Sequence, residues 1–447
     1  AENFIGFSGG SVTRTPVSQA VGSPVVFESA VATHVSAVHD PDQNKIIISY
    51  RDEGNSNYGT AVAGTVSGTN ISFGSPVVFE SANVQYTAIS YDTNSDKVVI
   101  SYQDNGNSAY GTSIIGSVSG TNISFGTAVV FNSAETISIV SAFDTSEAKV
   151  LVAYRDNGNS AYGTAMVGSV SGTGISFGSE SLFYATAGTM PTGASYDSVS
   201  STVGILYNAY TVDQLLCRIA TISGTSVSFG TQTSNLKTSA GNTSIAAANG
   251  KFIVSYRNSS SGGVGQAIVG VLSGTSIAFG DPQEFSSNSV SFTNLAYNAA
   301  AEQIIVSYKD NDSSNDGVIN AGTISGTTIS WGSNVTFASA VGASDTMTTT
   351  YDSTSKVVLV AYQNTDNSNY GTSVLFRSPY TQVDRAEISN GGNAVIQTGC
   401  AINDTQTGLT AGQQYFVQTD GTLGLTAGSP SVIAGTAISA TDIIVKG

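Results

Sequence analysis

The chain repeats itself, and this repetition is the feature that most narrows what it can fold into. Within its 447 residues, the string Ser-Gly-Thr-x-(Ile/Val)-(Ser/Ala)-(Phe/Trp)-Gly occurs six times. Its copies start in steps of 52, 52, 52, 50 and 52 residues, at Ser67, Ser119, Ser171, Ser223, Ser273 and Ser325. A second landmark, an apolar run that ends in tyrosine, occurs at Tyr50, Tyr102, Tyr154, Tyr207, Tyr256, Tyr308 and Tyr362. Seven tyrosine landmarks indicate seven related units.

Each unit has the pattern of four short strands separated by turns. In the second unit we expect strands at 87–92, 97–103, 112–118 and 123–131, with polar turns between them. No stretch shows a sustained helical period. A period of about 50 residues with four strands per unit is typical of a β-propeller. The sequence therefore predicts an all-β fold, a seven-bladed β-propeller with four-stranded blades at 13–378.

The two ends of the repeat region are expected to complete each other. The seventh unit lacks its fourth strand, whereas the string Gly-Ser-Pro-Val-Val-Phe-Glu-Ser-Ala occurs at 22–30 as well as at 74–82. We therefore expect the N-terminal strand to supply the fourth strand of the last blade. Closure of this kind removes exposed sheet edges.

The repeat stops after Arg377. We expect a small β-rich C-terminal module at 379–447, with a hairpin at 413–425 around a type I′ turn at Asp420-Gly421 and a final strand at 437–445. Residues 1–12 form a lead-in, and we expect its Phe4 and Phe7 to pack on this module.

Charge and composition exclude several classes of function. The chain has 15 Lys and Arg against 31 Asp and Glu, a net charge of −16, so we expect no nucleic-acid partner. Its apolar runs fall short of the ~20 residues of a membrane helix, so we expect no membrane insertion. His34 and His39 are the only histidines, which excludes a three-histidine zinc site. We expect each to be an ordinary packed or surface side chain, and we expect no cofactor.

Repeated aspartates follow the landmark tyrosines, at Asp52, Asp104, Asp156 and Asp310. A carboxylate at this position most simply accepts backbone N–H groups in a tight loop. Asp310, Asp312 and Asp316 also gather oxygen atoms in one short loop, which makes them a weak calcium candidate. They lack the Gly and Glu of the EF-hand pattern, so a solvated acidic loop is the favoured interpretation.

Several stretches resemble structural proteins of marine bacteriophages. The tail Gly-Leu-Thr-Ala-Gly-Gln-Gln-Tyr-Phe-Val-Gln-Thr-Asp-Gly-Thr-Leu at 408–423, with the segment at 427–441, is similar to the C-terminal module of phage tail-fibre proteins. The blade string Tyr-Arg-Asp-x-Gly-Asn-Ser-x-Tyr-Gly-Thr and the lead-in at 1–7 resemble parts of the same proteins. The resemblance implies a virion-surface or host-recognition role and carries over no catalytic residue.

We therefore predict a non-enzymatic phage virion protein, a tail fibre or other surface appendage, which serves structural display and host-surface adhesion. Its expected location is the virion or an extracellular surface. The expected partners are a bacterial cell-surface glycan or receptor, other virion proteins and further copies of this chain. One alternative is a propeller-type enzyme that acts on polysaccharides, a glycosidase or depolymerase. Another is a purely structural virion component without a ligand.

A binding site is expected on the face that carries the longer loops between the second and third strands. Around its central mouth, the aligned first residues of the first strands are His34, Tyr86, Ser138, Pro191, Thr243, Phe292 and Thr346. Aromatic rings beside hydrogen-bonding groups suit sugar stacking. The candidate ligand-binding residues are His34, Tyr86, Phe292, Arg51, Arg155, Arg257, Tyr58, Tyr110 and Tyr162. The alternative is that the tyrosines only pack the loops.

Overall fold

The structure is a computed structural model that describes residues 13–238, 240–342 and 347–384, and the short stretches 402–403, 409–410, 413–417, 423–425, 433–437 and 443–445. The chain divides into two compact units. The repeat unit is Ser18–Pro379, and the terminal unit combines Ala1–Val17 with Tyr380–Gly447.

The expectation of an all-β fold is confirmed. Long antiparallel sheets account for the regular structure, and the described helical elements are four 3-10 turns: η1 (Glu53–Asn55), η2 (Asn105–Asn107), η3 (Ser259–Ser261) and η4 (Thr365–Asn367). No helix in the described ranges is long and apolar enough to cross a membrane.

The repeat unit contains seven antiparallel sheets, numbered here in chain order. Sheet 1 is built from β3 (Val25–Asp40), β4 (Lys45–Asp52), β5 (Tyr58–Ser67) and β6 (Asn70–Phe73). Sheet 2 is built from β7 (Val77–Asp92), β8 (Lys97–Asp104), β9 (Tyr110–Ser119) and β10 (Asn122–Phe125). Sheet 3 is built from β11 (Val129–Asp144), β12 (Lys149–Asp156), β13 (Tyr162–Ser171), β14 (Gly174–Phe177) and β15 (Ser181–Tyr184).

Sheets 4 to 7 follow the same order from the inner strand outwards. Sheet 4 is built from β16 (Thr189–Asp197), β17 (Thr202–Ala209), β18 (Gln214–Ser223) and β19 (Ser226–Phe229), and sheet 5 from β20 (Ala240–Ala247), β21 (Lys251–Asn258), β22 (Val264–Ser273) and β23 (Ser276–Phe279). Sheet 6 is built from β24 (Gln283–Asn298), β25 (Gln303–Asp310), β26 (Asp316–Ser325), β27 (Thr328–Trp331) and β28 (Val335–Ala338). Sheet 7 is built from β29 (Thr348–Asp352), β30 (Val357–Asn364) and β31 (Tyr370–Arg377), with β2 (Ala20–Val21).

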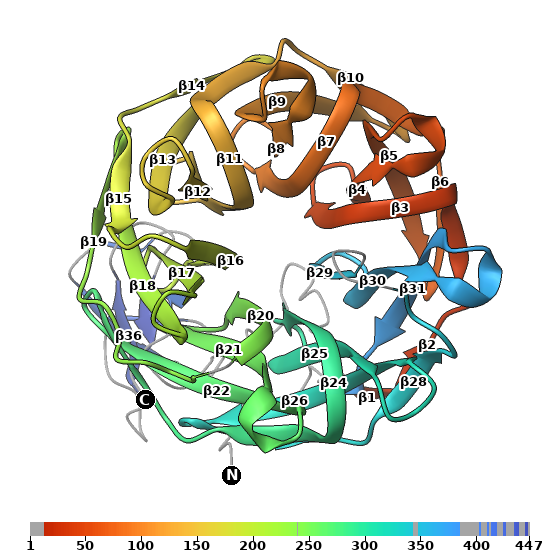
Figure 1. Cartoon of the computed structure of the whole chain (residues 1–447). Coiled ribbons are helices and arrows are strands. Elements are labelled where there is room, and N and C mark those ends of the chain that lie inside the picture. Colours follow the sequence, from red (N-terminus) through yellow and green to blue (C-terminus); the bar gives the residue numbers. More distant parts are fainter. Residues whose placement is uncertain are drawn as a thin grey trace. The chain divides into compact units, whose positions relative to one another are not determined.

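The sheets follow one another around a ring, with the inner strands facing its centre (Figure 1). The predicted pairing of the segment at 22–30 with the last sheet is confirmed. In β3, Val25 and Val26 pair with Ser373 and Thr372 of β31, whereas the second half of the same strand pairs with β4. The first and last sheets are therefore joined by backbone hydrogen bonds.

A tyrosine at the centre of each sheet explains the repeat landmarks. All seven landmark tyrosines have no exposed surface. Six of these rings pack against a phenylalanine from the outer strand of the preceding sheet, with centroids 5.1–5.3 Å apart. In the Phe79–Tyr102 pair, for example, Phe79 lies in the half of β7 that pairs with β5 of sheet 1, and Tyr102 lies in sheet 2. A Cβ on Gly59 would lie 2.4 Å from the Phe79 ring. The Tyr-Gly-Thr string thus places a glycine where the phenylalanine ring needs space.

The outer strands differ from the prediction. A single strand was expected at 123–131, but β10 ends at Phe125 and β11 begins at Val129. A Cβ on Gly126 would lie 2.0 Å from the carbonyl oxygen of Thr173 in the next sheet, so the chain bends here to pass the neighbouring turn. After the break, β11 pairs first with β9 of sheet 2 and then with β12 of sheet 3. One long strand therefore links two sheets.

The terminal unit is also built from strands. Its β1 (Thr13–Val17) pairs with β32 (Tyr380–Asp384), and its remaining strands form a second sheet. The described strands of that sheet are β33 (Ile402–Asn403), β34 (Gln414–Val417), β35 (Leu423–Gly424), β36 (Ile433–Ala437) and β37 (Ile443–Val445).

The predicted hairpin pairing in this unit is confirmed, because Phe416 pairs with Gly424. The final strand expected at 437–445 is wrong, because Ala437 pairs antiparallel with Ile443 and so belongs to a separate strand. The turn type at Asp420-Gly421 and the packing of Phe4 and Phe7 fall outside the described residues.

Candidate functional site

Six of the seven inner strands carry a bulge near the start of their pairing with the second strand of the sheet. At this point the pairing with the second strand shifts register, for example between Gln85 and Ala88 of β7. In five sheets a residue other than glycine adopts a left-handed backbone there, with φ between 47° and 54°: His34, Tyr86, Ser138, Asn242 and Phe292. Such a conformation is unfavourable for most side chains, and bulges often redirect a side chain beside a site.

A central cavity of about 1050 Å³ runs along these inner strands. All seven inner strands contribute to it: β3, β7, β11, β16, β20, β24 and β29. The described lining consists of hydroxyl, amide, aromatic and aliphatic side chains, such as Ser36, Thr192, Asn294 and Tyr86. Hydroxyl and amide groups both donate and accept hydrogen bonds, so this wall matches a neutral polar ligand.

The predicted mouth residues are brought together in part. His34, Tyr86, Ser138, Pro191 and Thr243 line the cavity. The His34 and Tyr86 rings lie 5.3 Å apart and come from neighbouring sheets. In sheet 5, the residue with the left-handed backbone is Asn242 rather than Thr243, so the sequence alignment was one residue out of step.

Phe292 does not belong to the described lining of the cavity. Its ring packs against the core cluster shared by sheets 6 and 7, with Nζ of Lys309 5.7 Å from its centroid. Thr346, the seventh aligned residue, lies outside the described residues.

The three candidate arginines occupy matching places but have different partners. Arg51 Nη2 lies 2.5 Å from Glu53 Oε1 in its own loop. Arg155 Nη1 lies 3.4 Å from the sulfur of Met190, a cavity residue. Arg257 Nη1 donates to Ser259 Oγ at 2.8 Å. Of the three, Arg155 is thus the arginine that contacts a residue of the cavity wall.

The three candidate loop tyrosines do not meet at the cavity. Tyr58, Tyr110 and Tyr162 are the first residues of β5, β9 and β13, and they pair in register with Asp52, Asp104 and Asp156. They are half-buried and lie outside the described cavity lining. Each sits beside the loop that follows the second strand, as the loop-packing alternative expects.

The repeated aspartates act as loop acceptors. Asp52 Oδ1 accepts hydrogen bonds from the backbone N–H groups of Gly54 and Asn55, and Asp104 and Asp156 accept equivalent bonds. Asp310 accepts from the N–H of Asp312 and from the side chain of Asn288. The described residues contain no group of three or more His, Cys, Asp and Glu arranged to hold a metal ion. The loop of Asp310, Asp312 and Asp316 is therefore explained by its own hydrogen bonds.

Two carboxylates, Glu28 and Asp52, lie near Tyr50, the landmark tyrosine of sheet 1. The Tyr50 hydroxyl donates to Glu28 at 2.8 Å, and the Tyr102 hydroxyl donates to Glu80 at 3.0 Å in the same way. Burial, and then the neighbouring charge of Asp52, raise the pKa of Glu28 above its ordinary value. Because the arrangement recurs in two sheets and binds the buried tyrosine, it serves packing.

An aromatic collar at the other end of the cavity escaped the sequence analysis. It consists of the residue before the last in six of the seven inner strands: His39, Tyr91, Phe143, Tyr196, Tyr297 and Tyr351. An aromatic residue followed by Asp or Asn recurs in six repeats, and this dipeptide was the available signal.

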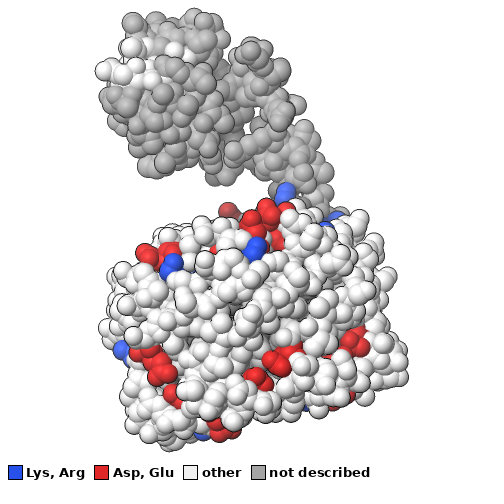
Figure 2. All heavy atoms as spheres, turned by 90° about the horizontal axis from the view of Figure 1, so that it is seen from above, with Lys and Arg blue, Asp and Glu red and all other residues white. Residues whose placement is uncertain are grey.

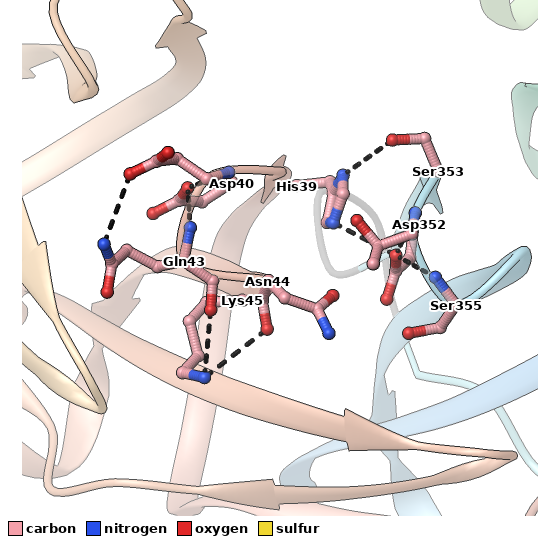
Figure 3. A network of polar contacts seen from close by, with 10 residues as sticks. His39, Asp40, Gln43, Asn44, Lys45, Asp352, Ser353 and Ser355 are labelled. Carbon is pink, nitrogen blue, oxygen red and sulfur yellow. Dashed lines mark hydrogen bonds and ion pairs between the residues drawn. The ribbon is translucent and has the colours of Figure 1, made fainter. Parts of the chain in front are cut away.

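Collar residues contact the turn of the preceding sheet. Asn249 Nδ2 donates to the Tyr297 hydroxyl, and the Ala300 N–H donates to that of Tyr351. Where sheet 1 meets sheet 7, His39 takes this role (Figure 3). Its Nε2 lies 3.0 Å from Asp352 Oδ1, and its Nδ1 lies 3.4 Å from Ser353 Oγ.

The environment of Asp352 favours its charged form. Burial raises the pKa of Asp352, but hydrogen bonds from His39 and from the backbone of Ser355 outweigh this effect and hold the pKa below its ordinary value. The carboxylate of Asp352 thus links His39 of sheet 1 to the turn that follows β29 in sheet 7.

Tyr210 is a second residue that the sequence analysis missed. It lies between β17 and β18, lines the cavity and leaves 62% of its surface exposed. Its neighbours in the lining include Met190 and the buried Asn208, which pair with each other across β16 and β17. The repeat string is lost in this loop, so alignment of the units did not select the residue.

Charge is distributed unevenly on the repeat unit. On the side that Figure 2 shows, acidic side chains gather along the two rims, and the wall between them is almost free of charge. The rims are where the turns and loops lie, so the acidic residues follow the repeated loop aspartates.

No protein-family model and no curated protein matches the chain. Among solved structures, a lectin from Burkholderia pseudomallei is similar, with a TM-score of 0.58 and 8% sequence identity over 79% of this chain and 99% of the lectin. A protein of unknown function from Dyadobacter fermentans has a TM-score of 0.47 and 10% identity over 80% and 99% of the two chains. At this identity the likeness to the lectin concerns the fold.

Proposed function

We propose that this chain is a non-enzymatic carbohydrate-binding protein and that the central cavity of a closed seven-bladed β-propeller is its sugar site. The observation that carries the proposal is the cavity of about 1050 Å³, lined by hydroxyl, amide and aromatic side chains. Ligand sites are typically concave and of about this size. The fold-level likeness to a lectin supports the proposal, because a protein named for sugar binding shares the architecture.

The aromatic residues at the mouth supply the contacts that sugars use. A sugar ring presents a C–H face that stacks on an aromatic ring and hydroxyl groups that need hydrogen-bond partners. His34 and Tyr86 offer two neighbouring rings, and Tyr210 offers an exposed one across the cavity lining. Ser138 and Asn242, at the bulges, lie in the same lining.

The biological setting stays a proposal that rests on the sequence resemblance. The segments at 408–423 and 427–441 are similar to phage tail-fibre modules, so we propose adhesion to a bacterial surface glycan from a virion or an extracellular surface. In this arrangement the propeller carries the ligand site, and the module at 379–447 serves attachment to other virion proteins.

The test is binding of the purified full chain to an array of bacterial surface polysaccharides, followed by titration calorimetry with the strongest ligand. Each stacked ring contributes about 1 kcal/mol, roughly a fivefold change in affinity. The double variant His34→Ala/Tyr86→Ala should therefore bind at least tenfold more weakly. Asn122→Ala, an exposed turn residue of β10, is the folded control and should bind as the unchanged chain does.

Three results would contradict the proposal. Absence of binding to every polysaccharide would favour a purely structural component. Release of reducing ends or unsaturated products from a polysaccharide would favour the enzyme alternative. Loss of binding in Asn122→Ala but not in the double variant would move the site away from the cavity.

A further inference from the structure

Among the described residues, the cavity rim at sheets 3 and 4 is the part that joins a cation to an aromatic ring with most of its surface exposed. Arg155 at the end of β12 touches Met190 of β16 through Nη1, and Ser138 Oγ lies 3.5 Å from the same sulfur. Met190 pairs with Asn208, and Tyr210 follows two residues later, with its backbone N–H bonded to Gly188 O. Met190, Asn208 and Tyr210 all line the cavity.

A comparison inside the chain shows that the charge of Arg155 is not neutralised. In sheet 1, the equivalent Arg51 forms an ion pair with Glu53, two residues further on. In sheet 3, this place is held by Asn157, whose amide donates to Glu135 at 2.7 Å instead. Among the described side chains, Arg155 has no ion pair with a carboxylate.

The contacts of Arg155 leave its donors underused. A guanidinium carries five N–H donors, yet the acceptor that Arg155 contacts is a thioether sulfur, which accepts hydrogen bonds weakly. Its Nε is buried without a hydrogen-bond partner. A carboxylate is the group that matches a guanidinium best, through two parallel hydrogen bonds.

We propose that the rim formed by Arg155, Met190, Asn208 and Tyr210 binds an acidic sugar, with the carboxylate of a uronic or sialic acid on Arg155 and the sugar ring against Tyr210. This inference rests on the proposed function and names the class of sugar that the site selects. Asn208 supplies an amide for a ring hydroxyl, and Met190 supplies an adaptable apolar surface.

The net charge of the chain limits how long and how densely charged an acidic ligand can be. A net charge of −16 repels a long polyanion, so attraction at a distance does not drive binding. Recognition must come from short-range contact at one guanidinium. A short acidic oligosaccharide, or a single acidic residue within a mostly neutral glycan, therefore fits better than a uniformly charged polymer.

The test uses a panel of acidic oligosaccharides, each compared with its own carboxyl-reduced form, titrated into the full chain. Suitable probes are oligogalacturonate, oligoguluronate, a hyaluronan tetrasaccharide and sialyllactose. We expect the acidic form of at least one probe to bind ten times more tightly than its reduced form. In Arg155→Gln this preference should fall to about twofold or less, because the charge-assisted hydrogen bonds are lost, whereas affinity for the reduced form should fall much less.

A matched control separates local contact from net charge. Lys149→Gln removes the same charge from the opposite end of the same strand, β12, and should keep the preference for acid. Tyr210→Ala should weaken both forms of the probe equally.

Two outcomes separate this inference from the proposed function. If the reduced forms bind as well as the acidic forms, or if Arg155→Gln keeps the preference, the acidic-sugar inference is wrong and sugar binding stands. If no form of any probe and no polysaccharide on the array binds, the proposed function fails and this inference fails with it.

Discussion

At the seam between sheets 1 and 7, a histidine takes the place that a larger aromatic ring holds in most other sheets. His39 of β3 reaches Asp352, the residue that ends β29, across this junction (Figure 3). Asp352 also accepts hydrogen bonds from the backbone of Thr354 and Ser355. Both side chains are buried. A buried carboxylate with three donors is costly to leave unpaired, so this contact matters for the closed ring.

We expect His39→Ala to lower the free energy of unfolding by about 2 kcal/mol, the typical effect of losing a hydrogen bond to a buried charged group. His39→Tyr should lose less, because tyrosine holds the same place in β7 and contacts Asp40 there. Denaturant unfolding of the two variants and the unchanged chain measures this. Equal midpoints for His39→Ala and the unchanged chain would contradict it.

The same contact makes an acid-dependent contribution to stability. The pKa of Asp352 lies below its ordinary value of 3.8 in the folded chain. The carboxylate therefore stabilises the fold fully above that value and loses its contribution as the pH falls through the folded pKa. Asp352→Asn should be less stable than the unchanged chain at pH 6, and the difference should shrink as the pH falls below about 3.8. Melting curves at a series of pH values test this.

Single residues were the hardest part to predict from the sequence. Repeat alignment located His34 and Tyr86 correctly at the cavity, because they occupy the same place in successive units. It failed for Phe292, since only packing decides whether a ring at the bulge faces the cavity or the core. Tyr210 lies in a loop where the repeat is lost, so alignment gave no position to compare.

At the scale of elements, the bulge in six of the inner strands decides which of their side chains reach the cavity. The extra residue allows a left-handed backbone at His34, Tyr86, Ser138 and Asn242. The strand then continues in register toward the collar. Without the bulge, alternate residues along the strand would exchange faces.

Ser138 offers a test of this backbone strain, because its φ is 52° and asparagine occupies the equivalent place at Asn242. Ser138→Val should destabilise the fold by about 1–2 kcal/mol, since a β-branched residue tolerates the left-handed region poorly. Ser138→Asn should be within about 0.5 kcal/mol of the unchanged chain. Chemical denaturation of both variants measures the difference, and equal losses would show that the bulge is not strained.

Element boundaries were predictable where a turn residue marks them. The strands around the Ser-Gly-Thr turns agree with expectation, because Gly68 and its equivalents hold a left-handed turn, with φ of 60–62°. The break at Gly126 was not predicted, because its cause is the carbonyl group of Thr173 in the next sheet. The glycine that ends each Ser-Gly-Thr string marks the place of the break, but the contact that requires it lies in the next sheet.

At the scale of the whole repeat unit, β3 belongs to two sheets and so joins the beginning of the ring to its end. Val25 and Val26 pair with β31, and Ala20 of β2 pairs with Arg377. This arrangement followed from a duplicated nine-residue string at 22–30, which shows that a strong internal repeat predicts even a contact between distant segments.

Deleting residues 1–30 should leave sheet 7 with three strands and an open edge. We expect a large loss of thermal stability together with aggregation, because unpaired edge strands associate with other chains. A synthetic peptide that covers residues 18–31, added in excess during refolding, should restore a soluble monomer. Val26→Thr is the control, since this side chain is 39% exposed. Light scattering and melting curves measure both effects, and a truncated chain that melts like the full one would contradict the closure.

The pairing of β3 with β31 also governs the order in which the molecule can be made. The hydrogen bond from Ser373 Oγ to Val25 O joins residues 348 positions apart. At about 5–20 residues per second, a ribosome reaches the second partner roughly 20–70 s after the first. Throughout that interval the first half of β3 presents free backbone groups, while the sheets between the two partners are still emerging. The nascent chain therefore carries an unpaired strand during most of its synthesis. When several ribosomes translate one message, their nascent chains lie close together, which favours exchange of this strand between neighbouring copies.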